Sequence, residues 1–239
     1  MGRLSSQSQK AHALIINKTL TLYGCMTPNL HAILMALSLP RLSTYLDAQD
    51  IRPPSLTQAL ELYLWNSQVS SALMTPISLC EVVIRNAVDD ALRALHGPSW
   101  PWEVGFYLSL PLKGRDTLEK ARRGQPTTGK VIAELSFGFW ENMFVRAFDD
   151  ALWNPYLATV LPHLPPSMTV QQARGHLRHE LDKLRRLRNR IAHHEPLLTL
   201  DVEQVIKDIE ALIGYRCTDT AAWMVQTNNL AALVMSRPR

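Results

Sequence analysis

The segment that most restricts the fold of this chain runs from residue 170 to residue 193, ahead of Pro196. Its large apolar residues recur at steps of four, three, three and four, at Leu177, Leu181, Leu184, Leu187 and Ile191. At about 100° per residue this spacing forms one narrow stripe along an α-helix. Such a stripe needs an apolar partner, so the segment predicts a helix packed against other helices. Ser167 and Thr169 are candidate N-caps.

Helical patterns fill most of the remaining chain. They cover residues 28–37, 41–47, 56–73, 77–95, 113–123, 130–140, 201–213 and 218–235. Pro76 is expected to kink or restart its helix. Residues 100–111 and 151–166 are expected to be irregular connections, because aromatic residues and prolines interrupt them. No strand alternation appears, so the sequence predicts an all-α fold.

Composition limits the class of protein. The chain has 239 residues, of which 46% are hydrophobic, enough for one large domain or two small ones. Its three widely spaced cysteines argue against a disulfide framework or a CxxC metal site. No signal peptide is recognisable, and no stretch reaches the roughly 20 apolar residues that span a bilayer. We therefore expect a cytoplasmic protein with no membrane partner.

Positive charge is concentrated in two regions of a mildly basic chain of net charge +4. Residues 174–190 hold seven basic side chains against Glu180 and Asp182, and residues 113–130 hold six against Asp116 and Glu119. Such clusters favour a polyanionic partner, although a solvated helix face has the same composition. Both interpretations stay open for each cluster.

Arg188 is the exception within the leucine stripe. It falls about 40° from Leu184 around the helix, inside the stripe, whereas Arg185, Arg186 and Arg190 fall outside it. Arginine is placed on an apolar face when it is paired or buried for a purpose. The sequence therefore predicts a functional role for Arg188, and the alternative is a structural one, in which Arg188 snorkels to solvent or pairs with a carboxylate to hold the core.

His193 and Asn189 complete a candidate site at the end of the same helix. Asn189 and His193, four residues apart, share a face, but His193 lies about 140° from Arg188 on an ideal helix. Pro196 disfavours helical geometry before it, so a frayed helix end would allow His193 to approach Arg188. A twofold dimer would also bring the two side chains together.

Arginine and histidine together suit phosphate chemistry on RNA. Histidine moves protons near neutral pH, and arginine stabilises charge on phosphoryl oxygens. His193 would take the proton of a ribose 2′-OH, whose oxygen attacks the adjacent phosphorus, while Arg188 stabilises the transition state. Products would be a 2′,3′-cyclic phosphate and a 5′-hydroxyl. The reaction needs no cofactor or metal and would not act on DNA.

Neighbouring side chains receive supporting roles. Arg185, Arg186, Arg190 and His194 are candidate RNA-binding residues. Glu81 and Arg85 are expected to pair with each other one turn apart, and we hypothesise that Glu81 instead meets Arg188 across the helix packing. Glu195 is expected to orient a histidine or to be solvated. His176 and His179 could share a metal ion with Glu180, but this site is disfavoured because it has no further strong ligand.

The motif and its surroundings also resemble a known family. Arg188-Asn189, three further residues and His193 match the R-N-x-x-x-H signature of HEPN domains, and LRNRIAHHEP is similar to their Abi-like (abortive infection) branch. Residues 37–46, 59–73, 81–92 and 133–144 resemble further blocks of that branch, in order. The resemblance covers residues 37–215, which implies an HEPN-like helical bundle with additional helices at both ends. Residues 1–36 are expected to be an arm, and residues 216–239 a helix packed on the domain.

The resemblance implies a homodimer with one composite cleft, in which the second His193 or water protonates the leaving oxygen. It implies a metal-independent endoribonuclease in phage defence or a toxin, with RNA as substrate and an antitoxin or regulatory protein as a further partner. Two other interpretations stay open: a non-catalytic RNA-binding or protein-interaction HEPN module, and a helical scaffold with no RNA role.

Overall fold

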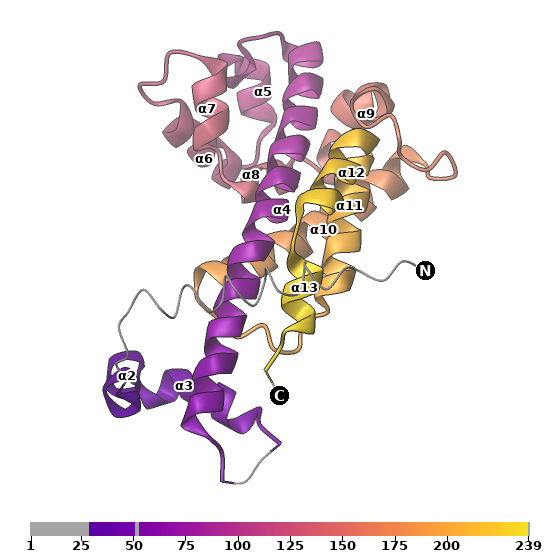
Figure 1. Cartoon of the computed structure of the whole chain (residues 1–239). Coiled ribbons are helices and arrows are strands. Elements are labelled where there is room, and N and C mark those ends of the chain that lie inside the picture. Colours follow the sequence, from indigo (N-terminus) through magenta and orange to yellow (C-terminus); the bar gives the residue numbers. More distant parts are fainter. Residues whose placement is uncertain (1–28, 51–52, 239) are drawn as a thin grey trace. The chain divides into compact units, whose positions relative to one another are not determined.

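The computed structural model describes residues 29–50 and 53–238. Over these ranges the chain is built from helices (Figure 1), with no strand, which confirms the predicted all-α class. It divides into two compact units between Glu61 and Leu62. This division falls inside a helix, whereas the sequence placed boundaries after residues 36 and 215. Residues 1–28 of the predicted arm lie outside the described residues.

Two short helices precede the long helix within the first unit. Helix α2 spans Leu30–Leu37 and begins at Asn29, whose side chain accepts a hydrogen bond from the N–H of Ala32. Helix α3 spans Leu39–Asp47, with Pro40 in its first turn, where the missing N–H costs nothing. The Gln49 side chain then donates to the carbonyls of Tyr45 and Ser55, which closes the turn that follows α3.

Helix α4 spans Leu56–His96 and continues through Pro76, so the predicted restart there is wrong. Proline removes one backbone hydrogen bond, but the apolar residues beside it, Leu73 and Ile77, are fully buried and hold the helix in place. By length and hydropathy α4 meets the criterion for a membrane span, although the sequence analysis expected no such segment. The core helix of a soluble protein meets the same criterion.

Residues 100–111, predicted to be irregular, form the 3₁₀ helix η1 (Trp100–Trp102) and helix α5 (Val104–Ser109). The cause is Glu103, whose carboxylate accepts the N–H groups of Gly105 and Phe106 and so caps α5. Helix α6 spans Leu112–Arg122. The predicted helix at residues 130–140 is divided into α7 (Thr128–Glu134) and α8 (Phe137–Asn142).

The core of this region includes Trp100, Phe106 and Trp140, whereas Trp102 is exposed. The Trp100 ring meets the Phe106 ring edge-on at 5.2 Å between centroids, and Trp140 at 6.3 Å. Trp100 and Trp140 are both fully buried. Burial of a tryptophan side chain removes a large apolar area from water. The rings therefore fix α8 against the elements that precede it.

The predicted connection at residues 151–166 is largely helical, so that prediction is wrong. A 3₁₀ helix, η2 (Arg146–Phe148), leads into the π-helix η3 (Asp149–Trp153) and then into α9 (Asn154–Val160). Pro155 lies in the first turn of α9, where proline is tolerated. Trp153 stacks on Phe144 at 4.5 Å, which buries the π-helix that the sequence pattern did not reveal.

Helix α10 spans Val170–Ala192 and confirms the leucine stripe, because all five predicted residues are buried. Thr169 begins it with a capping box that involves Gln172. Helix α11 spans Val202–Gly214 and begins at Asp201, which caps the N–H of Gln204. α10 packs against α8 and η3, and the candidate site lies on the α8 side of this packing.

Two helices close the chain instead of the one predicted. α12 spans Thr218–Thr227 and α13 spans Leu230–Met235. Asn228 ends α12: its side chain donates to the carbonyls of Met224 and Val225 and accepts the N–H of Leu230. α12 packs on α11, and the indole N–H of Trp65 donates to the carbonyl of Leu233 at 2.7 Å. These contacts hold the C-terminal helices on the second unit.

Candidate functional site

Most of the basic cluster on α10 is neutralised by carboxylates. Five of its side chains form ion pairs, namely Arg174 with Asp149, Lys183 with Glu180, Arg185 with Glu141, Arg186 with Asp182 and Arg190 with Glu195. Within the described ranges Arg178 and Arg188 have no ion pair. The solvated-face interpretation therefore explains much of the cluster, and Arg188 is one of the two cations left with free donors.

Arg188 is exposed rather than buried in the stripe. Its Cα direction lies close to that of Leu184, but Leu184 is buried and Arg188 opens towards solvent at the edge of the helix packing. A structural ion pair is not found for it among the described residues, whereas its exposure agrees with the snorkelling that the sequence also left open. Its donors therefore remain available to a ligand.

A cleft of about 440 Å³, here called the arginine cleft, lies beside Arg188. α4 contributes Glu81, the α7–α8 junction contributes Leu135, Ser136, Phe137 and Gly138, and α10 contributes Arg185, Arg188 and Asn189. The structure thus brings the predicted Arg188, Asn189 and Glu81 into one cleft. The sequence pattern did not reveal the junction at Leu135 and Ser136, because it predicts an unbroken helix there.

Glu81 supplies a half-buried carboxyl group to this cleft. Burial raises the pKa of Glu81 above its ordinary value, against the positive charges of Arg188 and Arg85, which lower it. Neither of the two expected ion pairs is present, since no N···O contact within 4 Å joins Glu81 to Arg85 or to Arg188 among the described residues. The Arg85 Nε atom is buried and has no hydrogen-bond partner in the part of the chain described.

The C-terminal end of α10 separates the two histidines. His193 is the C-cap, and His194 follows in the left-handed region at φ 56°. The His194 N–H donates to the carbonyl of Ile191 and the Glu195 N–H to that of Arg190, which is the Schellman pattern of helix termination. The helix thus ends where Pro196 predicted, with an ordered turn rather than a frayed one.

His193 and His194 point to different surroundings. His193 is exposed and lines none of the described clefts that contain Arg188 or Asn189. His194 lines a separate pocket of about 230 Å³ beside hydroxyl and amide groups of α4, namely Tyr63, Asn66, Ser67, Ser70 and Ser71. A single chain therefore does not bring His193 into the arginine cleft.

The other predicted RNA-binding residues hold the protein together. Arg185 donates to the buried Glu141 and to Asp182, both at 2.5 Å, and so ties α8 to α10. Arg190 donates to Glu195 at 3.3 Å and to the carbonyl of Pro196 at 2.8 Å. Arg190 and Glu195 therefore stabilise the end of α10, while Arg186 keeps an exposed guanidinium beside Asp182.

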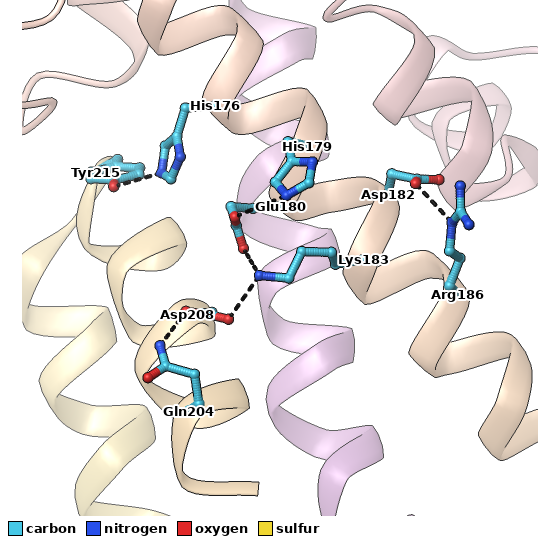
Figure 2. A network of polar contacts seen from close by, with 9 residues as sticks. All are labelled: His176, His179, Glu180, Asp182, Lys183, Arg186, Gln204, Asp208 and Tyr215. Carbon is cyan, nitrogen blue, oxygen red and sulfur yellow. Dashed lines mark hydrogen bonds and ion pairs between the residues drawn. The ribbon is translucent and has the colours of Figure 1, made fainter. Parts of the chain in front are cut away.

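The face of α10 that turns to α11 carries a polar network (Figure 2). His176 is hydrogen-bonded to the Tyr215 hydroxyl at 3.1 Å, and the Lys183 ammonium bridges Glu180 and Asp208. Across the described ranges, no group of three His, Cys, Asp or Glu side chains is arranged to hold a metal ion. This face joins two helices and is separate from the arginine cleft, whose lining includes none of these residues.

Comparisons with known proteins add no family to this geometry. No family model matches the chain, and neither a curated protein nor a solved structure matches it.

Proposed function

We propose that this protein is a metal-independent endoribonuclease of the HEPN type. The observation that carries the proposal is the surroundings of Arg188. It is the arginine of the R-N-x-x-x-H motif, it has no ion pair among the described residues, and it lines a cleft with Asn189 and Glu81. A guanidinium with free donors beside an open cleft is suited to bind a phosphodiester.

The proposed reaction assigns each side chain a task. Arg188 stabilises the negative charge that develops on the phosphoryl oxygens, and Asn189 donates a hydrogen bond to the phosphate or orients the histidine. His193 takes the 2′-OH proton. Because His193 does not line the cleft of its own chain, it comes from a second copy in a twofold dimer. The leaving 5′-oxygen takes its proton from Glu81, which lines the same cleft, or from water.

A biological role in phage defence, or as a toxin with a neutralising partner, belongs to the same proposal, as does a cytoplasmic location. These parts rest on the sequence resemblance alone. A second candidate function is a non-catalytic RNA-binding or protein-interaction module. The absence of His193 from the lining of the arginine cleft favours this candidate, because a module that only binds RNA has no need of a proton-transfer group there.

Cleavage of RNA in EDTA tests the proposal. Purified wild type, Arg188→Ala and His193→Ala are incubated with total RNA and with matched DNA. Wild type should cleave RNA alone, and each variant should lose at least about 10²-fold in rate. Arg178→Ala is the matched control, because Arg178 lies on the same helix, also lacks an ion pair among the described residues, and lines none of the described clefts.

Equal cleavage by Arg188→Ala and wild type would reject the proposed site. RNA binding by a folded wild type that never cleaves would favour the non-catalytic module.

A further inference from the structure

A second cleft, here called the apolar cleft, adjoins the arginine cleft. Its volume is about 400 Å³, within the usual range of small-ligand pockets. Ser136, Gly138 and Arg185 line both clefts, so these three residues form the border between them. The Arg185 guanidinium is held in place by Glu141 and Asp182. The border is therefore a fixed part of the structure, and one ligand can extend across it.

The floor of the apolar cleft consists of nearly buried side chains. Leu110, Phe139, Met143 and Phe148 are each at most 6% exposed and present apolar surface to the cleft. A floor of this kind binds the flat face of an aromatic ring, since burying that face removes apolar area from water. The floor of the cleft is thus suited to the apolar face of a ring system.

Polar groups lie at the edge of the same cleft. The Thr117 hydroxyl donates to the Lys113 carbonyl at 2.8 Å, which leaves its oxygen free to accept. The Asn142 amide donates to the Gly138 carbonyl at 2.6 Å, which leaves its own carbonyl oxygen and a second N–H. Lys113 is exposed at the rim and has no ion pair within the described ranges. The cleft therefore combines an apolar floor with edge groups that can read a heterocycle.

We propose that the apolar cleft binds the base of the nucleotide next to the phosphodiester held at Arg188. The inference rests on the proposed ribonuclease function and names the part of the substrate that determines where it cuts. Thr117 and Asn142 bond the edge of the base, and Lys113 neutralises a neighbouring phosphate. Bases are accessible in this way only in single-stranded RNA, because a duplex keeps them stacked.

Binding of RNA that cannot be cleaved tests this subsite apart from catalysis. The probes are fluorescent 2′-O-methyl tetranucleotides of A, C and U, and the readout is the dissociation constant from anisotropy. Wild type should bind its best base about tenfold more tightly than its worst. Thr117→Phe fills the cleft and should reduce this difference in affinity between the best and the worst base to about twofold. Asn142→Ala, at an exposed position, should also narrow it without affecting folding.

Thr159→Phe is the matched control, because Thr159 is exposed on α9 and lines neither cleft. It should keep the wild-type difference in affinity. Three results would each overturn the subsite. The ratio between the weakest and the tightest dissociation constant could stay unchanged in both Thr117→Phe and Asn142→Ala, wild type could bind all probes equally, or it could bind none of them.

Cleavage of natural RNA distinguishes failure of the subsite from failure of the ribonuclease. Cleavage that shows no preference for the base beside the cut, combined with equal binding of all probes, overturns the subsite and leaves the ribonuclease in place. Base-selective binding that Thr117→Phe abolishes, by a wild type that never cleaves, supports the subsite as an RNA-binding site and rejects the ribonuclease.

Discussion

Arg185 and Arg188 lie one turn apart on α10 but have different electrostatic surroundings. Arg185 contacts two carboxylates, one of them the nearly buried Glu141, whereas Arg188 is exposed and has no ion pair among the described residues. A carboxylate that loses its only partner inside a protein is costly, because it can regain neither water nor charge. Substitution of Arg185 should therefore reduce mainly the stability of the fold, and substitution of Arg188 mainly the proposed activity.

We expect Arg185→Ala to lower the free energy of unfolding by about 2 kcal/mol, less than for a fully buried pair because Arg185 is partly exposed. Arg188→Ala should change it by no more than about 0.5 kcal/mol. Urea unfolding of both variants measures the difference. A loss of stability in Arg188→Ala as large as that in Arg185→Ala would show that Arg188 has a structural role.

Glu81 links stability to pH. Its pKa is raised by burial, although Arg188 and Arg85 oppose the shift, so the folded protein disfavours the ionised form. Stability from this group is complete below the ordinary glutamate pKa of about 4.3 and is lost as the pH rises through the folded value. At neutral pH an ionised Glu81 is therefore less favourable in the folded state than a neutral side chain.

Glu81→Gln should accordingly be more stable than wild type at pH 7, and the two should converge at about pH 4. Thermal unfolding between pH 4 and pH 8 measures this. If Glu81 is also the acid of the reaction, the same variant should lose about 10²-fold or more in cleavage rate. A variant that is less stable than wild type at pH 7 would mean that the two arginines outweigh the effect of burial.

The end of α10 depends on one residue in an unusual backbone conformation. His194 adopts φ 56°, where a Cβ atom is unfavourable and glycine is the usual residue. His194→Gly should therefore be about 1 kcal/mol more stable than His194→Ala, since both lack the imidazole and differ only in the Cβ. At Arg186, in the interior of the same helix, the order should reverse, with alanine favoured by about 1 kcal/mol. Chemical denaturation of the four variants compares them, and an advantage of alanine at both positions would rule out the left-handed turn.

Periodicity predicted the long elements and missed the short ones. The leucine stripe and the Thr169 cap appear in the structure because each depends on residues a few positions apart. The continuous path of α4 through Pro76 and the π-helix at Asp149–Trp153 were not predictable in this way. Both elements are stabilised by tertiary contacts that bury Ile77 and Trp153. Such contacts cannot be deduced from a local sequence pattern.

The candidate site was also predictable only in part from the sequence. Sequence geometry singled out Arg188, and the resemblance to HEPN domains grouped it with Asn189 and His193. The structure brings the predicted Glu81 into the same cleft and adds the Ser136–Gly138 junction, which the sequence did not indicate. It also places Arg188 at the exposed edge of the stripe. An angle of about 40° from Leu184 does not determine whether a long side chain at that edge turns into the core or to solvent.

At the scale of the whole molecule, the proposed reaction needs a histidine that a single chain does not place in the arginine cleft. His193 does not line the arginine cleft, so the proposed reaction requires two copies whose motifs face each other. A twofold dimer places two such sites symmetrically, each with Arg188 from one chain and His193 from its partner. A mixed dimer of two inactive variants would then contain one intact site.

Mixing Arg188→Ala with His193→Ala should therefore restore cleavage to roughly a quarter of the wild-type rate, because half of the dimers are mixed and each holds one of two sites. The measurement is RNA cleavage after the two variants have exchanged subunits, with each variant alone as the control. No recovery, in a mixture shown to contain mixed dimers, would place both residues in one chain's site.

The central claim, attack by the ribose 2′-OH at a phosphate bound by Arg188, is tested most directly by the ends of the cleavage products. RNA oligonucleotides are incubated with wild type and Arg188→Ala in EDTA, and the products are analysed by mass spectrometry. We predict 2′,3′-cyclic phosphates and 5′-hydroxyls from wild type, and intact RNA from the variant. Products with 5′-phosphates, or cyclic phosphates formed equally by Arg188→Ala, would contradict this account of the site.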